Sequence, residues 1–218
     1  MHAVRYGTIV DRVVPHSESQ SSALVRNTLL VVAGTIFVSL LAQISIPWYP
    51  VPFTGQTLAV LLVGGVLGAW RGAASLLLYF IIGALGLPVF SDQAGGWDII
   101  TGATGGYIIG FILAAAVVGW IAERGADRRV VPMILALILG NVLIYAIGVP
   151  WLASWTPPGA SAPLGWSQAY LFGIEPFVFG DALKLVIAAA LLPAGWALLQ
   201  RTGAGRKNAD DGPDAGML

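Results

Sequence analysis

The chain alternates long apolar segments with short polar or proline-rich ones. The apolar segments occupy residues 24–46, 57–70, 72–87, 105–122, 130–152 and 177–199. An α-helix rises about 1.5 Å per residue, so roughly 20 apolar residues cross a bilayer. The second and third segments are short and are separated by Arg71, so they span only if the neighbouring loops are embedded in the protein. The pattern predicts an all-α membrane protein, a bundle of six transmembrane helices.

Composition places this bundle in lipid. Hydrophobic residues make up 57% of the chain and charged residues only 10%, whereas soluble domains carry about 25% charged residues. The formal net charge is zero, which argues against a nucleic-acid partner. The chain has no cysteine, so disulfides and thiolate metal sites are excluded.

The cations orient the bundle. With six helices, all eleven Lys and Arg residues except Lys184 fall on the side that holds both termini. Positive residues concentrate in the cytoplasm, so we expect both termini there, in a multi-pass protein of the bacterial cytoplasmic membrane. Residues 1–23 are expected to be a cytoplasmic tail without a signal peptide. Residues 24–199 form the transmembrane substrate-binding domain, and 200–218 a disordered cytoplasmic tail.

The cation on the other side, Lys184, is the strongest functional signal. It lies 17 residues before Arg201, which is about 25 Å along a helix. Asp181 precedes it by three residues, so both side chains share one helix face. Charged groups inside a membrane segment usually face a cavity or a partner. We therefore expect Asp181 and Lys184 to bind substrate. The structural alternative is a self-neutralising pair that joins this helix to a neighbour.

The connections on the side of Lys184 are rich in Trp, Tyr, Pro and Gly. They are expected to lie over a pocket, or alternatively to form only an aromatic belt. Three predicted helices begin at this face, and their free N–H groups favour an anion. Together with Lys184, they suit a carboxylate-bearing solute. Gln56 offers an amide near the start of the second helix.

A glycine-rich segment, residues 101–107, precedes the fourth helix. Thr104 can cap that helix, and its glycines allow a ligand to approach the backbone closely. Glycines at positions 102, 106 and 110 are equally suited to close helix packing.

Sequence motifs for several chemistries are missing. The chain has no G-x-x-x-x-G-K-[ST] phosphate loop, no H-E-x-x-H and no G-x-S-x-G, and both histidines lie near the N-terminus. We therefore expect no enzyme activity, no ATP hydrolysis by this chain, no bound metal and no cofactor.

Several motifs in series resemble one family. They are residues 51–61 (VPFTGQTLAVL), Tyr79, residues 83–90, residues 104–107 (TGGY) with Gly110 and Phe111, and Asp181 with Lys184. This series, over about residues 30–195, is similar to BioY proteins, the biotin-specific S components of energy-coupling factor (ECF) transporters. One departure is Ala103, where the family pattern has Pro before Thr-Gly-Gly-Tyr.

The resemblance implies a six-helix bundle that binds biotin with high affinity from outside and takes it up across the membrane. Its partners would be membrane lipid, a transmembrane coupling subunit (EcfT- or BioN-like) and ATPase subunits (EcfA- or BioM-like). The substrate-binding residues it implies, together with those above, are Asp181, Lys184, Tyr107, Thr101, Thr104, Gly105 and Gln56.

The first predicted helix carries a stripe of small residues: Thr35, Ser39 and Ala42. Small residues let helices approach closely in lipid, so the stripe predicts a docking surface for a partner subunit. Packing inside the bundle is the alternative. Two other functions stay open: a proton-coupled secondary carrier in which Asp181 titrates against Lys184, and an S component for another carboxylate-bearing vitamin. Self-association stays open as well.

Overall fold

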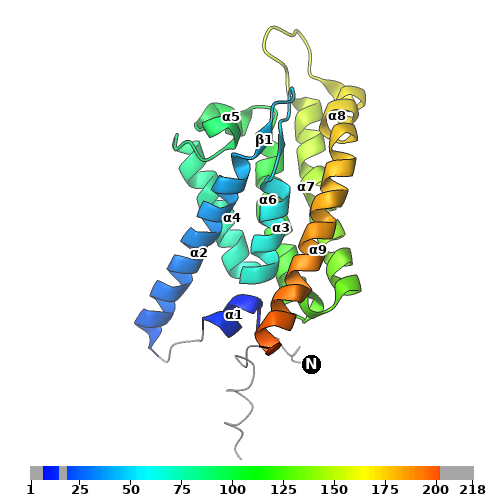
Figure 1. Ribbon diagram of the computed structural model, residues 1–218. Coiled ribbons are helices and arrows are strands. Elements are labelled where there is room, and N and C mark those ends of the chain that lie inside the picture. The colour runs from blue at the N-terminus through cyan, green and yellow to red at the C-terminus, as the bar shows by residue number, and fades with distance from the viewer. Residues whose placement is uncertain (1–6, 15–18, 202–218) are drawn as a thin grey trace, which may run out of the picture.

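The computed structural model describes residues 7–14 and 19–201. Its α-helices are α1 (Ile9–Val13), α2 (Gln20–Ala42), α3 (Gln56–Leu67), α4 (Ala69–Ala84), α5 (Trp97–Thr101), α6 (Gly105–Ala122), α7 (Val130–Ser154), α8 (Gly165–Gly173) and α9 (Val178–Arg201). Short 3-10 turns are η1 (Ser91–Gln93), η2 (Ala126–Arg128) and η3 (Glu175–Phe177). The helices run roughly side by side in one bundle (Figure 1).

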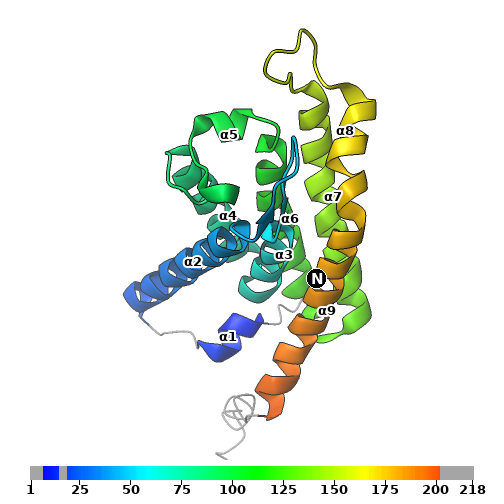
Figure 2. The ribbon, with the colours of Figure 1, turned by 45° about the horizontal axis from the view of Figure 1, so that its top comes forward.

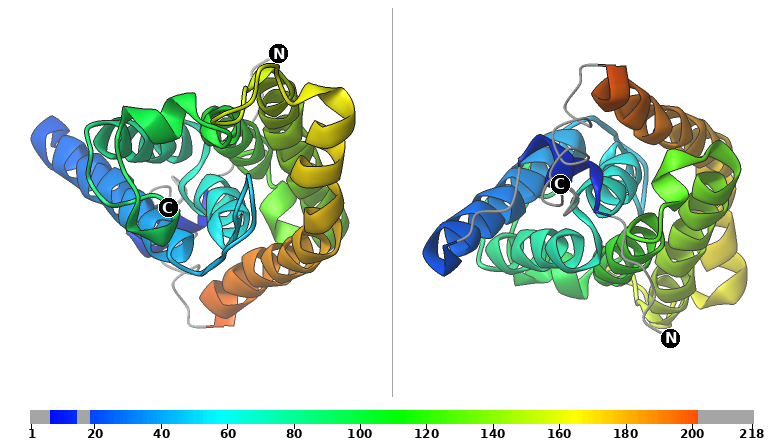
Figure 3. Two further views of the ribbon diagram at one scale, coloured as in Figure 1. Left: turned by 90° about the horizontal axis from the view of Figure 1, so that it is seen from above. Right: turned by 90° about the horizontal axis from the view of Figure 1, so that it is seen from below.

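The bundle has two different ends. We call the end that carries β1, β2, α5 and α8 the loop end, and the opposite end, beneath which α1 lies, the α1 end (Figures 1 and 2). Helix α6 packs against α3, α4 and α7 and is the most buried of the long helices. Helices α2 and α9 both pack against α3, as the views along the bundle axis show (Figure 3).

The apolar segments predicted from sequence are helices, so the chain is a mostly helical membrane protein. Four helical stretches are long and apolar enough to cross a membrane: Gln20–Ala42, Gly105–Ala122, Val130–Ser154 and Gly165–Arg201. Helices α3 and α4 have 12 and 16 residues, so they are shorter than the roughly 20 that a spanning helix needs. The count of six spans and the side of the termini therefore stay predictions.

The break between α3 and α4 lies at Gly68, and the prediction that Arg71 separates them is wrong. Arg71 is in the first turn of α4. Gly68 has φ +87°, which a residue with a side chain rarely adopts. The backbone of Gly68 also packs directly on Gly119 of α6. The turn is therefore made by a glycine that needs both an unusual dihedral angle and a close contact.

The first predicted helix ends earlier than expected, at Ala42. Residues 45–46 form β1 (Ser45–Ile46), which pairs antiparallel with β2 (Phe53–Thr54) in the register Ser45↔Thr54 and Ile46↔Phe53. Together with α5 and α8, this hairpin makes the loop end an ordered structure, which the sequence pattern did not show.

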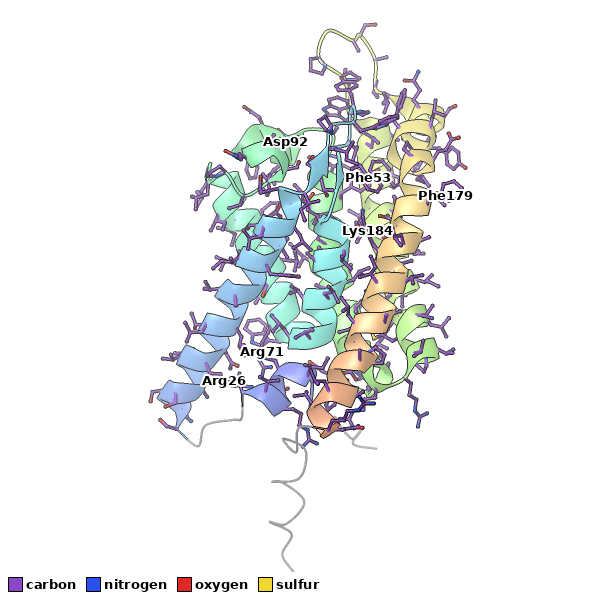
Figure 4. The ribbon with its side chains drawn as sticks, viewed as in Figure 1. Arg26, Phe53, Arg71, Asp92, Phe179 and Lys184 are labelled. Atoms are coloured by element: carbon purple, nitrogen blue, oxygen red, sulfur yellow. The ribbon has the colours of Figure 1, made fainter. Side chains whose placement is uncertain are left out.

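Part of the expected N-terminal tail is also ordered. Helix α1 lies under the bundle, near Arg26 of α2 and Arg71 of α4 (Figure 4). Asp11 of α1 accepts hydrogen bonds of 2.9 Å from both arginines. Burial raises the pKa of Asp11, but the bonds from Arg26 and Thr8 and the charge of Arg71 outweigh this and lower it to about 2. Part of the predicted tail, residues 1–23, is thus folded against the bundle, and its cytoplasmic location stays a prediction. Residues 202–218, the predicted disordered tail, lie outside the described residues.

The small-residue stripe on α2 faces the interior of the protein. Thr35 and Ala42 are buried, and the Thr35 hydroxyl donates a 2.9 Å hydrogen bond to the Ser75 carbonyl on α4. Ser39 donates to the Thr35 carbonyl. Burial of Thr35 and Ala42 argues against the predicted docking surface and favours the alternative, because Thr35 packs α2 against α4. Ser39 is half-buried, and its docking role stays a prediction. The exposed face of α2 carries Leu29 and Leu40 instead.

Candidate substrate-binding site

Asp181 and Lys184 form an ion pair in the first two turns of α9. Lys184 Nζ lies 3.0 Å from Asp181 Oδ1, and the two side chains are 11% and 4% exposed. In Figure 4 Lys184 points from α9 toward the interior of the bundle, whereas Phe179 points away from it. The shared face that the i,i+3 spacing predicted is therefore the inner face of α9.

Three helices supply hydrogen-bond donors to Asp181. Oδ1 accepts from Lys184 at 3.0 Å and from the Thr57 hydroxyl of α3 at 3.2 Å. Oδ2 accepts from the Tyr145 hydroxyl of α7 at 2.6 Å and from Asn141 Nδ2 at 3.4 Å. Lys184 Nζ also donates to Thr57 Oγ1 at 3.0 Å. Donors from α3, α7 and α9 thus fix the orientation of the carboxylate beside Lys184.

An aromatic pair covers the ammonium group on one side. Lys184 Nζ lies 4.2 Å from the ring centroid of Phe53 in β2, within the range of a cation–π interaction. Phe53 stacks on Phe177 with centroids 5.7 Å apart. A methyl group at Gly180 would overlap the Phe53 ring. Because Gly180 has no side chain, the hairpin can close directly against α9 next to the charge.

A cavity lies beside the ion pair. It is lined by Val51, Pro52, Thr54, Gln56, Thr57, Phe90, Ser91, Ile99, Thr104, Tyr107, Ile108, Phe111, Ile144, Tyr145, Phe177, Asp181 and Lys184. The space between these side chains, together with its opening to the outside, measures about 580 Å³. Most of the wall is apolar, and the charges lie on one side. This suits a ligand with an apolar body and a few polar groups.

Gln56 lines the cavity, but its amide is already bonded. Its Nε2 donates to the buried Tyr79 hydroxyl at 2.6 Å, and its Oε1 accepts from Thr54 Oγ1 at 2.8 Å. Gln56 thus ties the start of α3 to α4 and to the hairpin. It contributes a fixed polar surface to the cavity wall.

Tyr107 and Thr104 also line the cavity. The Tyr107 hydroxyl donates to the Gly173 carbonyl at 3.1 Å, and its ring meets the edge of Tyr145 with centroids 6.2 Å apart. Thr104 occupies the N-cap position of α6, but its side chain makes no capping bond. The predicted side-chain cap is therefore wrong: the hydroxyl lies 3.5 Å from the Ile99 carbonyl.

Thr101 and Gly105 are not among the lining residues. Thr101 is exposed at the end of α5, where it donates to the Trp97 carbonyl at 3.1 Å. Gly105 is buried with its Cα against the Ile100 carbonyl and Trp151. The glycine-rich segment thus packs α6 against α5 and α7, which is the alternative that the glycine spacing had left open.

Thr57, Asn141 and Tyr145 were missed by the sequence reasoning. Asn141 and Tyr145 are four residues apart on α7, hence on one face, and an Asn within an apolar segment is a usable signal. Asn141 Oδ1 is buried without a hydrogen-bond partner among the described residues. No group of three or more potential His, Cys, Asp or Glu metal ligands occurs in the described part of the chain.

These features define a class: a multi-pass membrane protein whose helices enclose a mostly apolar cavity with an ion pair in its wall, under structured loops. The chain belongs to the BioY family, whose model matches residues 15–201. It is a multi-pass protein of the cytoplasmic membrane, in keeping with its apolar helices.

Relatives and a solved structure agree with this assignment. The biotin transporter BioY of Rhizobium etli is 38% identical over 75% of this chain and 88% of its own length. The biotin transporter BioY of Thermotoga maritima is 39% identical over 74% and 92%. The crystal structure of the S-component for biotin from an ECF-type ABC transporter matches with a TM-score of 0.67, 21% identity, and coverage of 82% of this chain and 94% of that one. The structural match shows the same fold.

Proposed function

We propose that this chain is the biotin-binding, substrate-specific subunit of an ECF-type importer. The observation that carries the proposal is the Asp181–Lys184 pair, which lies in the wall of the cavity on the inner face of α9. A buried ion pair is costly inside a membrane protein and usually marks a ligand pathway. Relatives that are named biotin transporters support biotin as the ligand.

Biotin matches the chemistry of the cavity. It carries a carboxylate on an apolar chain and a ureido ring with both donors and acceptors. Lys184 would donate to an anionic or carbonyl oxygen, and Asp181 would accept a ureido N–H. The rings of Tyr107 and Tyr145, which line the cavity, would pack on the bicyclic ring. Accepting a ligand N–H requires one of the four donors around Asp181 to move aside.

Calorimetric titration of the purified full-length protein with biotin and other carboxylate-bearing vitamins tests the ligand. We expect binding of biotin and a higher unfolding temperature in its presence, because a ligand that binds only the native state stabilises it by mass action. Selective binding of another vitamin would support a substrate-binding subunit of this type but with a different substrate. No binding of any vitamin would refute the assignment.

Energy for uptake would come from a coupling subunit and two ATPase subunits, since the chain has no phosphate loop. The family and its relatives are transporters, so we assign no enzyme activity and no cofactor. Uptake that collapses with an uncoupler, but not on ATP depletion, would favour the proton-coupled carrier instead. Reduced co-purification with partners after substitution of the exposed Leu40 would place the docking surface on the outer face of α2.

In the proposed topology, six spans place both termini and the α1 end in the cytoplasm, as the cation distribution predicts. The loop end, with the cavity, would then face outward. Reporter fusions after Arg201 and within residues 157–165 should give opposite locations. The same location for both would refute the six-span arrangement.

A further inference from the structure

In the turn between α6 and α7, the acidic side chains point into the protein, and two arginines are exposed. Glu123 accepts a 2.9 Å hydrogen bond from the Ala69 backbone N–H at the start of α4. Asp127 is fully buried and accepts a 2.5 Å bond from the Trp196 indole N–H on α9. Arg124 and Arg129 are exposed. The acids of this turn therefore hold the bundle together, while two arginines face the surroundings.

Arg124 is held in a defined position. Its guanidinium carbon lies 3.4 Å from the ring centroid of Trp120, and its Nη1 donates to the Trp120 carbonyl at 2.7 Å. A guanidinium has five N–H donors, so this bond leaves most of them for a ligand. Trp120 itself is 50% exposed. A half-exposed Trp at the end of an apolar helix is typical of the boundary between bilayer core and headgroups.

Exposed apolar side chains follow Arg129 directly. Val130, Val131 and Leu135, in the first turns of α7, are 53%, 67% and 63% exposed. Arg129 immediately precedes them. Arg129 thus lies where an exposed apolar surface meets the polar end of the protein, and Arg124 lies at the other end of the same turn.

Three other arginines at the α1 end have partners within the protein. Arg26 and Arg71 both bond Asp11, and the Arg128 guanidinium lies 4.3 Å from the Trp196 ring centroid. Within the part of the chain that the structure describes, Arg124 and Arg129 take part in no ion pair, so their charge is available to an external anion.

We propose that Trp120, Arg124 and Arg129 form a binding site for the phosphate of an anionic phospholipid, whose acyl chains lie along the exposed face of α7. Arginine pairs with phosphate through two parallel N–H donors, and an anionic membrane surface attracts each such cation. This lipid would anchor the α6–α7 turn, to which Asp127 and Trp196 join the end of α9. The site is at the opposite end of the bundle from the cavity, so it does not depend on which ligand the cavity takes.

Native mass spectrometry of the full-length protein with phosphatidylglycerol or phosphatidylcholine tests the site. At about 1 kcal/mol for each arginine, the double variant Arg124→Gln, Arg129→Gln should bind phosphatidylglycerol about 10- to 30-fold more weakly. Binding of phosphatidylcholine should not change. The matched control, Arg12→Gln with Arg201→Gln, removes the same charge from the same end and should weaken phosphatidylglycerol binding less than about 3-fold.

Three results would overturn the proposal. Unchanged phosphatidylglycerol binding in the double variant would show that these arginines do not form a lipid site. An equal loss of phosphatidylglycerol affinity in the control variant would show a general effect of charge. Displacement of phosphatidylglycerol by inorganic phosphate at equal concentration would indicate a site for a free anion. An unchanged vitamin affinity would show that the double variant is folded. Failure of the wild type to bind biotin would refute the proposed function and leave the lipid result intact.

Discussion

The Tyr145 hydroxyl on α7 donates a 2.6 Å hydrogen bond to Asp181 Oδ2 on α9. This bond joins two long helices at the level of the cavity, and the Tyr145 ring lines that cavity. Its partner oxygen belongs to the carboxylate that also holds Lys184. One hydroxyl group thus joins α7 to α9, orients the Asp181 carboxylate and belongs to a residue of the cavity wall.

Tyr145→Phe removes only this hydroxyl. Hydrogen bonds to charged groups contribute about 1.5–3 kcal/mol, so we expect the free energy of unfolding to fall by about that amount and biotin affinity to fall as Asp181 loses its orientation. Denaturant unfolding and calorimetric titration measure the two effects. In an Asp181→Asn background the same substitution should cost much less, because the charged acceptor is gone. Equal costs in both backgrounds would mean that the hydroxyl acts independently of Asp181.

Lys184→Ala should weaken biotin binding about 10- to 150-fold, the value of a lost charge-assisted hydrogen bond. Asp181 keeps its bonds from Thr57, Asn141 and Tyr145, so the fold should survive. Calorimetric titration of the variant gives the affinity.

The double variant Lys184→Met, Asp181→Asn is the control for that experiment, because it removes both charges and roughly keeps the volume. If Asp181 and Lys184 contact the ligand, the double variant should fold but bind biotin poorly. Near-normal biotin affinity in the double variant would instead identify the pair as a structural link between α9 and its neighbours.

Gly148→Ala should disturb the cavity through Tyr107. A methyl group at Gly148 would overlap the Tyr107 ring, and such overpacking typically costs about 1–3 kcal/mol. Both the free energy of unfolding and biotin affinity should fall. Gly195→Ala is the matched control, because there the added methyl would lie 3.4 Å from Ile9 Cδ1, an ordinary contact. If both variants behaved alike, close packing at Gly148 would not matter.

Because Asp127 is buried, we expect the free energy of unfolding to depend on pH. Burial raises its pKa from 3.8 to about 6, although the Trp196 bond and the Arg128 charge oppose this. The native state therefore binds the proton more tightly than the unfolded state, and stability falls as pH rises through 6. Wild type should lose about 1–2 kcal/mol from this group between pH 5 and pH 8. Asp127→Asn should remove that loss, as measured by thermal unfolding at both pH values. A variant with the same pH profile as wild type would contradict the assignment.

Much of the fold follows from the apolar segments. The fourth predicted segment, 105–122, coincides with α6, and the fifth lies within α7. Asp181 and Lys184 were identified because a charge within such a segment is conspicuous, and both line the cavity. The hairpin and α8 were missed, because Pro- and aromatic-rich segments have no periodic pattern that distinguishes ordered from irregular structure.

The apolar pattern could not identify the hydrogen-bond partners of Asp181. Thr57 lies 124 residues away in sequence and Tyr145 lies 36 residues away. Such contacts depend on how each helix is rotated about its axis. In a soluble helix the polar face reveals this rotation, but here lipid and protein interior are both apolar. The same ambiguity made the stripe with Thr35 look like a docking surface.

The order of apolar segments and the rare charges within them were enough to predict a helical membrane protein with a charged pair on one face of its last helix. A backbone in lipid must satisfy its own hydrogen bonds, which leaves helices as the solution for such segments. Tertiary structure alone decided which helix faces turn inward, which hydroxyls reach Asp181 and how Phe53 covers Lys184. Those outcomes depend on close packing between distant segments, such as the contact of Phe53 with Gly180, and the local sequence of neither segment contains that information.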